Sequence, residues 1–198
     1  MTTLKSLLRR ASLVTSGSLL LTAFTVQADT TVTFLRHGEK PETSTGQLTC
    51  KGFNRALALP SVLLARFGMP DTIYASAPKE NKTGSSLRPL TTILPTAIQA
   101  ERPVILKYHA TQTEGLVSDI LSARSLHKRV FVSWEHKNLV VAAKRLVKQT
   151  GGDPEQIPSW PGQDFDSLYI IRLNDQGRFE SFNKETEGLN GVSDRCQK

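Results

Sequence analysis

The stretch TVTFLRHGEKP, residues 31–41, decides the fold that we predict for this chain. Its first five residues are β-branched or apolar, which is typical of a buried or half-buried strand. The strand pattern stops at Arg36-His37-Gly38, and Pro41 prevents regular structure from continuing at once. Open α/β sheets place ligands at the carboxyl ends of their strands. The stretch therefore predicts an anion site at such an edge.

The residue types at this strand end suit phosphate chemistry. Arg36 offers a planar fork of donors for phosphate oxygens, and His37 offers a nitrogen nucleophile. Gly38 allows the backbone to approach a ligand closely. We include Gly38, Glu39 and Lys40 as candidate substrate-binding residues. An Arg-His-Gly tripeptide by itself is weak evidence, so the rest of the chain must supply its partners.

The N-terminal residues have the pattern of a secretory signal peptide. A basic start precedes an uncharged apolar run over residues 11–26, and Val26-Gln27-Ala28 presents small residues at a cleavage position. We expect cleavage after Ala28, no stable membrane anchor afterwards, and a periplasmic or secreted domain over residues 29–198. An uncleaved anchor is the alternative, although the apolar run is shorter than the ~20 residues that span a bilayer.

Length and charge limit the classes of protein. The 198 residues suit one domain with its own core. Loss of residues 1–28 would remove three of the 25 basic residues and none of the 18 acidic ones, lowering the formal charge from +7 to +4. The sequence has no arginine-rich arm and no zinc-finger spacing, so we expect no nucleic-acid partner. A small anionic substrate fits the modest positive charge, while protein partners stay open.

Strand and helix patterns alternate from residue 31 onward, which predicts an α/β domain. Strands are expected at 31–35, 72–75, 104–106 and 129–134, helices at 48–67, 91–99, 114–123 and 137–149, and a hairpin from 164–173 and 178–182. Thr49 is the expected N-cap of the first helix, which Pro60 should kink or split. Pro95 should likewise interrupt the second helix, and the tail after Lys184 should be irregular.

Cys50 and Cys196 are the two cysteines of the chain. In an exported protein they could pair and tie the tail to the first helix. Two free thiols are equally compatible with the sequence, since it does not show whether their Cα atoms lie within bridging distance.

Two further positions repeat the pattern of the first strand end. His136 follows the strand at 129–134 and opens a helix, so His37 and His136 are expected to reach one pocket. Arg88 lies at the start of a helix, where free backbone N–H groups favour an anion. His109 and His127 lack such a context and are expected to be exposed. The polar loop of residues 78–86 has lysines that suggest a lid or, as a simpler interpretation, a solvated loop.

Taken in order, the motifs resemble a known family. They are LRHGE at 35–39, LTxxGxxRA at 48–56, IYAS at 73–76 with RPLTT at 88–92, and the strand ending at His136. This set is similar to the histidine phosphatase superfamily, in its branch 1, across nearly the whole expected mature chain. The resemblance implies a phosphoglycerate mutase-like fold, a three-layer α/β/α sandwich with a mostly parallel central sheet.

The resemblance also implies roles. His37 would attack phosphorus and form a phosphohistidine, Arg36 and Arg88 would hold the phosphoryl oxygens, and His136 would add a donor. Fixed cations suit a phosphomonoester, which carries about −1.5 to −2 charges near pH 7. No organic cofactor is implied. No metal site is expected either, because the sequence has no His-x-His or His-Glu-x-x-His spacing.

The general acid is less clearly marked. Better-known members of the family use a glutamate after the third strand, and Glu114 lies in about that region. Glu135, directly before His136, is the candidate that we rank first, and Glu39 is a third. A glutamate in this role needs a pKa raised toward neutrality.

The sequence thus predicts an exported phosphatase that hydrolyses phosphomonoesters through a phosphohistidine on His37. A mutase is disfavoured, because its sugar-acid substrates are normally cytoplasmic. The uncertain general acid leaves open a catalytically weak relative that binds a phosphorylated ligand in the cell envelope. A structural envelope protein is a third possibility, which predicts no response of thermal stability to phosphate or vanadate.

Overall fold

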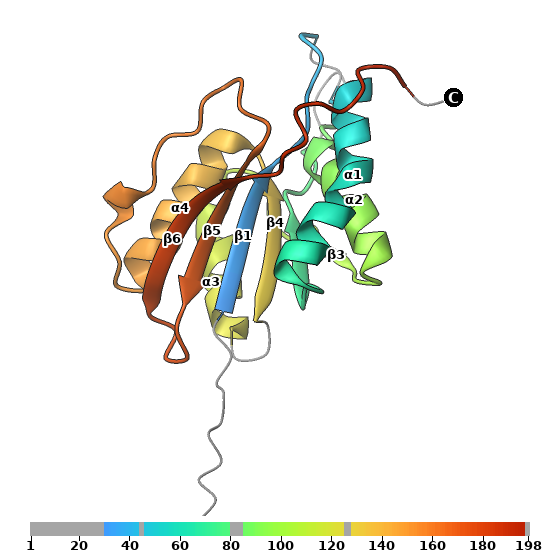
Figure 1. Cartoon of the computed structure of the whole chain (residues 1–198). Helices are drawn as coiled ribbons and strands as arrows, with labels where there is room; N and C mark the ends of the chain where they lie inside the picture. The colour runs from blue at the N-terminus through green and yellow to red at the C-terminus, as the bar shows by residue number, and fades with distance from the viewer. Residues whose placement is uncertain (1–29, 44–45, 80–84, 125–127, 197–198) are drawn as a thin grey trace, which may run out of the picture.

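A computed structural model describes residues 30–43, 46–79, 85–124 and 128–196. In these residues, one six-stranded sheet has helices on both of its faces (Figure 1). The strands are β1 (Thr30–Arg36), β2 (Thr72–Ala75), β3 (Val104–Ile105), β4 (Arg129–Trp134), β5 (Ser167–Leu173) and β6 (Phe179–Thr186). The helices are α1 (Cys50–Phe67), α2 (Arg88–Gln99), α3 (Thr113–Ala123), α4 (His136–Gln149) and the 3₁₀ turn η1 (Pro154–Gln156).

The strand order of the sheet is β3-β2-β4-β1-β5-β6. The four strands from β3 to β1 are parallel, while β5 and β6 continue the sheet in antiparallel fashion. Arg36 at the end of β1 lies opposite Trp134 at the end of β4. The residues after these two strands therefore emerge side by side at one edge, as the sequence predicted.

Two apolar clusters fill the spaces between the sheet and the helices on its two faces. Alternate residues of β1 point to opposite faces, so that Phe34 belongs to the cluster under α3 and α4, while Leu35 belongs to the one under α1 and α2. Leu59 and Leu63 of α1 complete the second cluster. This is the expected three-layer α/β/α arrangement with a mostly parallel central sheet.

Neither helix is split at its proline. Helix α1 continues through Pro60 and α2 continues through Pro95. A proline removes one backbone hydrogen bond from a helix, but packing of the residues around it keeps both halves in place. In α1, Leu59, Pro60 and Leu63 are all buried. The N-cap prediction is confirmed, because the Thr49 side chain accepts a hydrogen bond from the backbone of Gly52.

The C-terminal tail is more ordered than the sequence indicated. Strand β6 extends to Thr186, and the chain then runs across one end of the sheet toward the start of α1 (Figure 1). There Cys196 forms a disulfide with Cys50, with the two Cα atoms 4.7 Å apart. The side chain of Asn54 donates to the carbonyl oxygens of Ser193 and Arg195, each at 2.8 Å. After Thr186 the tail has no helix or strand, as expected, but it is held in place by these contacts, whose partners are remote in sequence.

The predicted leader, residues 1–28, lies outside the described residues. Among the residues that are described, no helix is both long enough and apolar enough to cross a membrane.

Candidate active site

His37 follows β1 directly and is only 4% exposed. Its Nδ1 lies 2.8 Å from the carbonyl oxygen of Gly38. A carbonyl accepts hydrogen bonds and cannot donate them, so this contact requires the proton on Nδ1. The lone pair of the neutral ring is then on Nε2. The backbone N–H of His37 is held by the carbonyl oxygen of Trp134 at 3.1 Å, which ties the end of β1 to the end of β4.

Burial, together with the positive charges of Arg36 and Arg88, lowers the pKa of His37 to about 4, against the opposing influence of the Gly38 carbonyl. A histidine with this pKa is neutral throughout the physiological range. The site therefore holds its imidazole in the form in which a ring nitrogen is nucleophilic.

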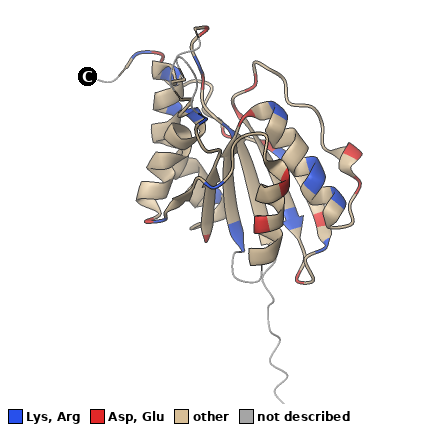
Figure 2. Ribbon diagram, turned by 180° about the vertical axis from the view of Figure 1, so that it is seen from behind, with Lys and Arg blue, Asp and Glu red and all other residues tan. Residues whose placement is uncertain are grey.

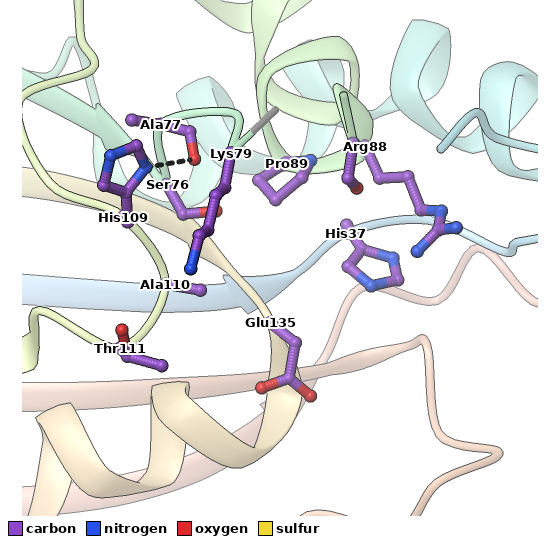
Figure 3. Close-up of a pocket in the computed structure, with 11 residues that line it drawn as sticks. His37, Ser76, Ala77, Lys79, Arg88, Pro89, His109, Ala110, Thr111 and Glu135 are labelled. Carbon is purple, nitrogen blue, oxygen red and sulfur yellow. Dashed lines mark hydrogen bonds between the residues drawn. The ribbon is translucent and has the colours of Figure 1, made fainter. Parts of the chain in front are cut away.

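A cavity of about 300 Å³ opens beside His37 (Figure 3). Around the imidazole it is lined by Arg88, Pro89 and Glu135, and Ser86 also belongs to its lining. The more distant part is lined by Ser76, Ala77, Lys79, His109, Ala110 and Thr111. The cavity thus lies at the carboxyl ends of β1, β2 and β4, where open α/β sheets bind ligands.

Lys79 and His109 also line the cavity. Lys79 belongs to the polar loop whose lysines suggested either a lid or a solvated loop, and His109 was expected to be exposed. Both are exposed, in agreement with the expectation for His109. The only sequence signal that could have placed His109 in the cavity is that it follows a strand of the parallel sheet, which a histidine in many surface loops would share. Lys82 and His127 lie outside the described residues.

Arg88 is the first residue of α2, and its guanidinium group lies beside the His37 imidazole (Figure 3). Its Nε donates to the carbonyl oxygen of Gln47 at 3.1 Å, which orients the side chain. Pro89 in the first turn suits the start of a helix, because its missing N–H would have no partner there. A cation and a helix N-terminus therefore meet next to the nucleophile.

Arg36 is almost fully buried and does not line the cavity. Its Nη1 donates to the carbonyl oxygens of Gly162 and Asp164 at 2.9 and 2.8 Å. The guanidinium carbon lies 3.8 Å from the centre of the Phe165 ring, a cation–π contact. These contacts hold a positive charge beside His37, while Nε has no hydrogen-bond partner within the described chain.

Glu135 lines the cavity, but its carboxylate also caps α4. Its two oxygens accept from the backbone N–H groups of Lys137 and Asn138 at 3.1 and 3.0 Å. Burial alone would raise the pKa of Glu135, but these donors and the adjacent His136 lower it below the usual value. In the free protein Glu135 is therefore ionised, opposite to the raised pKa that a general acid needs.

His136 begins α4 one residue later, and its Nδ1 lies 2.7 Å from a carboxylate oxygen of Glu135. It is not among the residues that line the cavity. Burial lowers the pKa of His136, and the charge of Arg36 lowers it further. Since Arg36 also lowers the pKa of His37, both imidazoles lie within the field of the same guanidinium group.

Three other candidate residues lie away from the cavity lining. Glu39 is held by two hydrogen bonds to Arg55, at 2.8 and 3.0 Å. Lys40 is exposed. Glu114 has a carboxylate that is mostly exposed and lies 3.6 Å from Arg145. The structure thus brings Glu135, and not Glu39 or Glu114, to the wall of the cavity.

Gly38 serves a close contact between two backbone segments. A Cβ atom at Gly38 would lie 2.8 Å from the carbonyl oxygen of Gly52, and one at Gly52 would lie 2.4 Å from that of Glu39. The backbone N–H of Gly38 donates to the hydroxyl of Thr92 at 2.9 Å. The loop after β1 is therefore clamped between the first turns of α1 and α2.

A buried cluster of charged residues around Arg55 holds Glu39 in the loop after β1. Arg55 is fully buried and pairs with Glu39, Asp166 and Glu187, each within 2.8 Å. Burial raises the pKa of Glu187 to about 8, although the charge of Arg55 opposes this. One guanidinium group is thus shared by three carboxyl groups. Across the described ranges, no group of three or more His, Cys, Asp or Glu side chains is placed to hold a metal ion.

Comparison with solved structures identifies the fold. The structure of the protein histidine phosphatase SixA complexed with tungstate matches with a TM-score of 0.56 at 14% identity, over 79% of this chain and 97% of that one. The alpha-ribazole phosphatase from Shigella flexneri matches with a TM-score of 0.55 at 14% identity, over 75% and 93%. A mycobacterial glucosyl-3-phosphoglycerate phosphatase with inorganic phosphate matches at 0.53 and 14%, over 79% and 96%.

At this level of identity the likeness concerns the fold. The chain has the phosphoglycerate mutase-like fold of these histidine phosphatases, which confirms the fold class expected from the sequence. No family model and no curated protein matches the chain.

Proposed function

We propose that this protein is an exported phosphatase of the histidine phosphatase superfamily, which hydrolyses phosphomonoesters through a phosphohistidine on His37. One observation carries the proposal: a buried, neutral imidazole with its Nδ1 proton already engaged lies in the wall of a cavity beside Arg88. The fold neighbours, which are named as phosphatases, support the same class of reaction.

The first chemical step follows from this arrangement. The lone pair of His37 Nε2 forms a bond to phosphorus while the bond from phosphorus to the alcohol oxygen breaks. Arg88 neutralises charge on the phosphoryl oxygens, and Arg36 contributes a second buried positive charge with an unpaired Nε donor. Water then attacks phosphorus, the N–P bond breaks, and its electron pair returns to Nε2. Splitting the hydrolysis in this way replaces one difficult step by two easier ones.

The alcohol must receive a proton as it leaves, and Glu135 is the carboxyl group in position to supply it. The pKa of Glu135 is lowered in the free protein. A phosphate dianion bound beside it acts in the opposite direction, because a nearby like charge favours the protonated form of a carboxyl group. Glu135 would then take the proton back from the attacking water in the second step.

Export remains part of the proposal on two grounds. The N-terminal pattern is that of a signal peptide, and the Cys50–Cys196 disulfide suits an oxidising compartment such as the periplasm or the cell exterior.

The second candidate function is a protein that binds a phosphorylated ligand with little turnover. The lowered pKa values of Glu135 and Glu39 favour it, because neither carboxyl group is held protonated for proton donation in the free protein.

Activity measurements on His37→Ala test the proposal. We expect wild type to hydrolyse both a chromogenic aryl phosphate and simple alkyl phosphates, and His37→Ala to lose more than about a thousandfold in kcat/KM. Acid quenching of wild type with labelled substrate should trap an acid-labile phosphoenzyme that His37→Ala lacks. Stabilisation by phosphate or vanadate without any turnover would support the binding protein. No stabilisation and no turnover would leave a structural role.

A Glu135→Gln variant tests the proton donor. We expect a loss of about 10²–10⁴-fold on alkyl phosphates, and a smaller loss on the aryl phosphate, whose leaving group needs little protonation. The same change at Glu114 is the matched comparison. If Glu114→Gln shows the larger loss on alkyl phosphates, the role belongs to Glu114 instead.

A further inference from the structure

The cavity beside His37 has more room than a phosphoryl group needs. Its volume of about 300 Å³ reaches the range of small-molecule sites, roughly 300–1,000 Å³. His37 and Arg88 occupy one part of it, and Lys79 and His109 line the other (Figure 3). The second part is thus placed to contact whatever group the substrate carries beyond its phosphate.

Lys79 supplies the positive charge in this second part. Its side chain extends into the cavity, and no ion pair within the described chain involves its ammonium group (Figure 3). The Nδ1 of His109 faces the carbonyl oxygen of Ala77 at 3.4 Å, a contact that favours a proton on that nitrogen and leaves Nε2 as an acceptor in the neutral ring. Glu135 is the one acidic residue among the described residues that line the cavity, and its oxygens are already engaged at the start of α4.

The backbone at Ala77 and from Tyr108 to Ala110, which forms one wall of the cavity, is held by several contacts. Ala77 and His109 form a parallel β-bridge, and the backbone N–H of Ala77 donates to the carbonyl oxygen of Tyr108 at 2.7 Å. The indole Nε1 of Trp134 donates to the carbonyl oxygen of Ala110 at 2.8 Å. Trp134 is fully buried beneath the site. These contacts therefore fix the segments around Ala77 and Ala110 relative to the end of β4.

We propose that Lys79 binds a second anionic group of the substrate. This rests on the proposed function, with His37 and Arg88 receiving the phosphate. The substrate class is then a phosphomonoester whose alcohol part carries a carboxylate or a second phosphate. A neutral alcohol part gains no charge-assisted hydrogen bond from the Lys79 ammonium group, whereas an anionic group does.

The test uses two compounds that differ in one group. Glycerol 3-phosphate and 3-phosphoglycerate are both primary alkyl phosphates, and only the second carries a carboxylate. Each is measured as a competitor of aryl phosphate hydrolysis; where the competitor is itself hydrolysed, its inhibition constant Ki equals its KM. We expect wild type to have a Ki for 3-phosphoglycerate that is lower by about three- to tenfold. A glycerol bisphosphate tests a second phosphate in the same way.

Lys79→Ala should bring the two Ki values together by weakening the competitor with the extra charge. Lys148→Ala is the matched control, because this exposed lysine lies in the last turn of α4 and about 18 Å along the helix from its first residue. It should preserve the difference between the two Ki values.

The two proposals fail in distinguishable ways. Equal Ki values in wild type for all three competitors, or an equal effect of Lys79→Ala on all of them, would overturn the second anion site and leave the phosphatase intact. Absence of aryl phosphate hydrolysis and of a trapped phosphoenzyme would overturn the proposed function itself.

Discussion

The imidazole of His37 depends on its surroundings for its reactive form. Burial is the largest influence that lowers its pKa, followed by the charges of Arg36 and Arg88. Its pKa in the folded protein, about 4, lies below its ordinary value of 6.5. The stability that this difference contributes is fully present above pH 6.5 and is lost as the pH falls through about 4, because the unfolded chain takes up the proton more readily.

At this residue we predict a titration near pH 4, followed through the ring resonances of His37 by NMR. Arg88→Ala should raise the pKa, because it removes a positive charge that disfavours the imidazolium form. The acid limit of activity should move up with it. A His37 that titrates near its ordinary value in folded wild type would contradict this account.

At the scale of elements, the first turn of α1 serves as a support for the loop after β1. Thr49 caps the helix, and its backbone N–H and its hydroxyl both donate to the carbonyl oxygen of Glu39, at 2.9 and 3.3 Å. Gly52 then passes so close to Glu39 that no side chain fits between them. The position of His37 therefore depends on a helix that begins 13 residues later in the chain.

A Gly52→Ala variant should disturb this support. The added methyl group would lie 2.4 Å from the Glu39 carbonyl oxygen, so the loop must shift. We expect a loss of about 1–3 kcal/mol in the free energy of unfolding, together with a fall in kcat. Gly191→Ala is the control, since nothing lies within 4 Å of its added carbon. Equal stability and activity in the two variants would show that the close contact is unimportant.

At the scale of the whole molecule, the C-terminal tail fastens the sheet to α1. Glu187 and Asp166 pair with Arg55 in the middle of that helix, and the disulfide joins Cys196 to Cys50 at its start, 146 residues apart in sequence. Away from this junction, lysine and arginine positions are spread over several elements with acidic positions among them (Figure 2). The strongest long-range ties thus converge on the helix that supports the active-site loop.

Loss of the disulfide should weaken the fold as a whole. We expect the double variant Cys50→Ser, Cys196→Ser to unfold at a lower temperature, with a loss of about 2–5 kcal/mol. Hydrogen exchange should increase in residues 187–196. Reductant should lower the Tm of wild type toward that of the double variant and leave the latter unchanged, because the sequence has two cysteines. An unchanged Tm in reduced wild type would contradict this role.

Local patterns were enough to predict most elements and part of the site. Alternating strand and helix periodicity located the parallel strands within a few residues, and the strand end before His37 indicated the edge where the cavity lies. The continuous helices through Pro60 and Pro95 were missed, because packing against the sheet outweighs the local cost of a proline.

The sequence by itself determined that residues 31–35 form a strand and that this strand ends at Arg36-His37-Gly38. Hydrophobic periodicity, glycine and proline affect only the backbone of residues close by in the chain. Only the tertiary structure decided that Glu135, Lys79 and His109 share one cavity with His37, and that Cys50 meets Cys196. The reason is distance along the chain. These contacts join segments that are tens to more than a hundred residues apart, and the packing of the whole sheet and its helices brings them together.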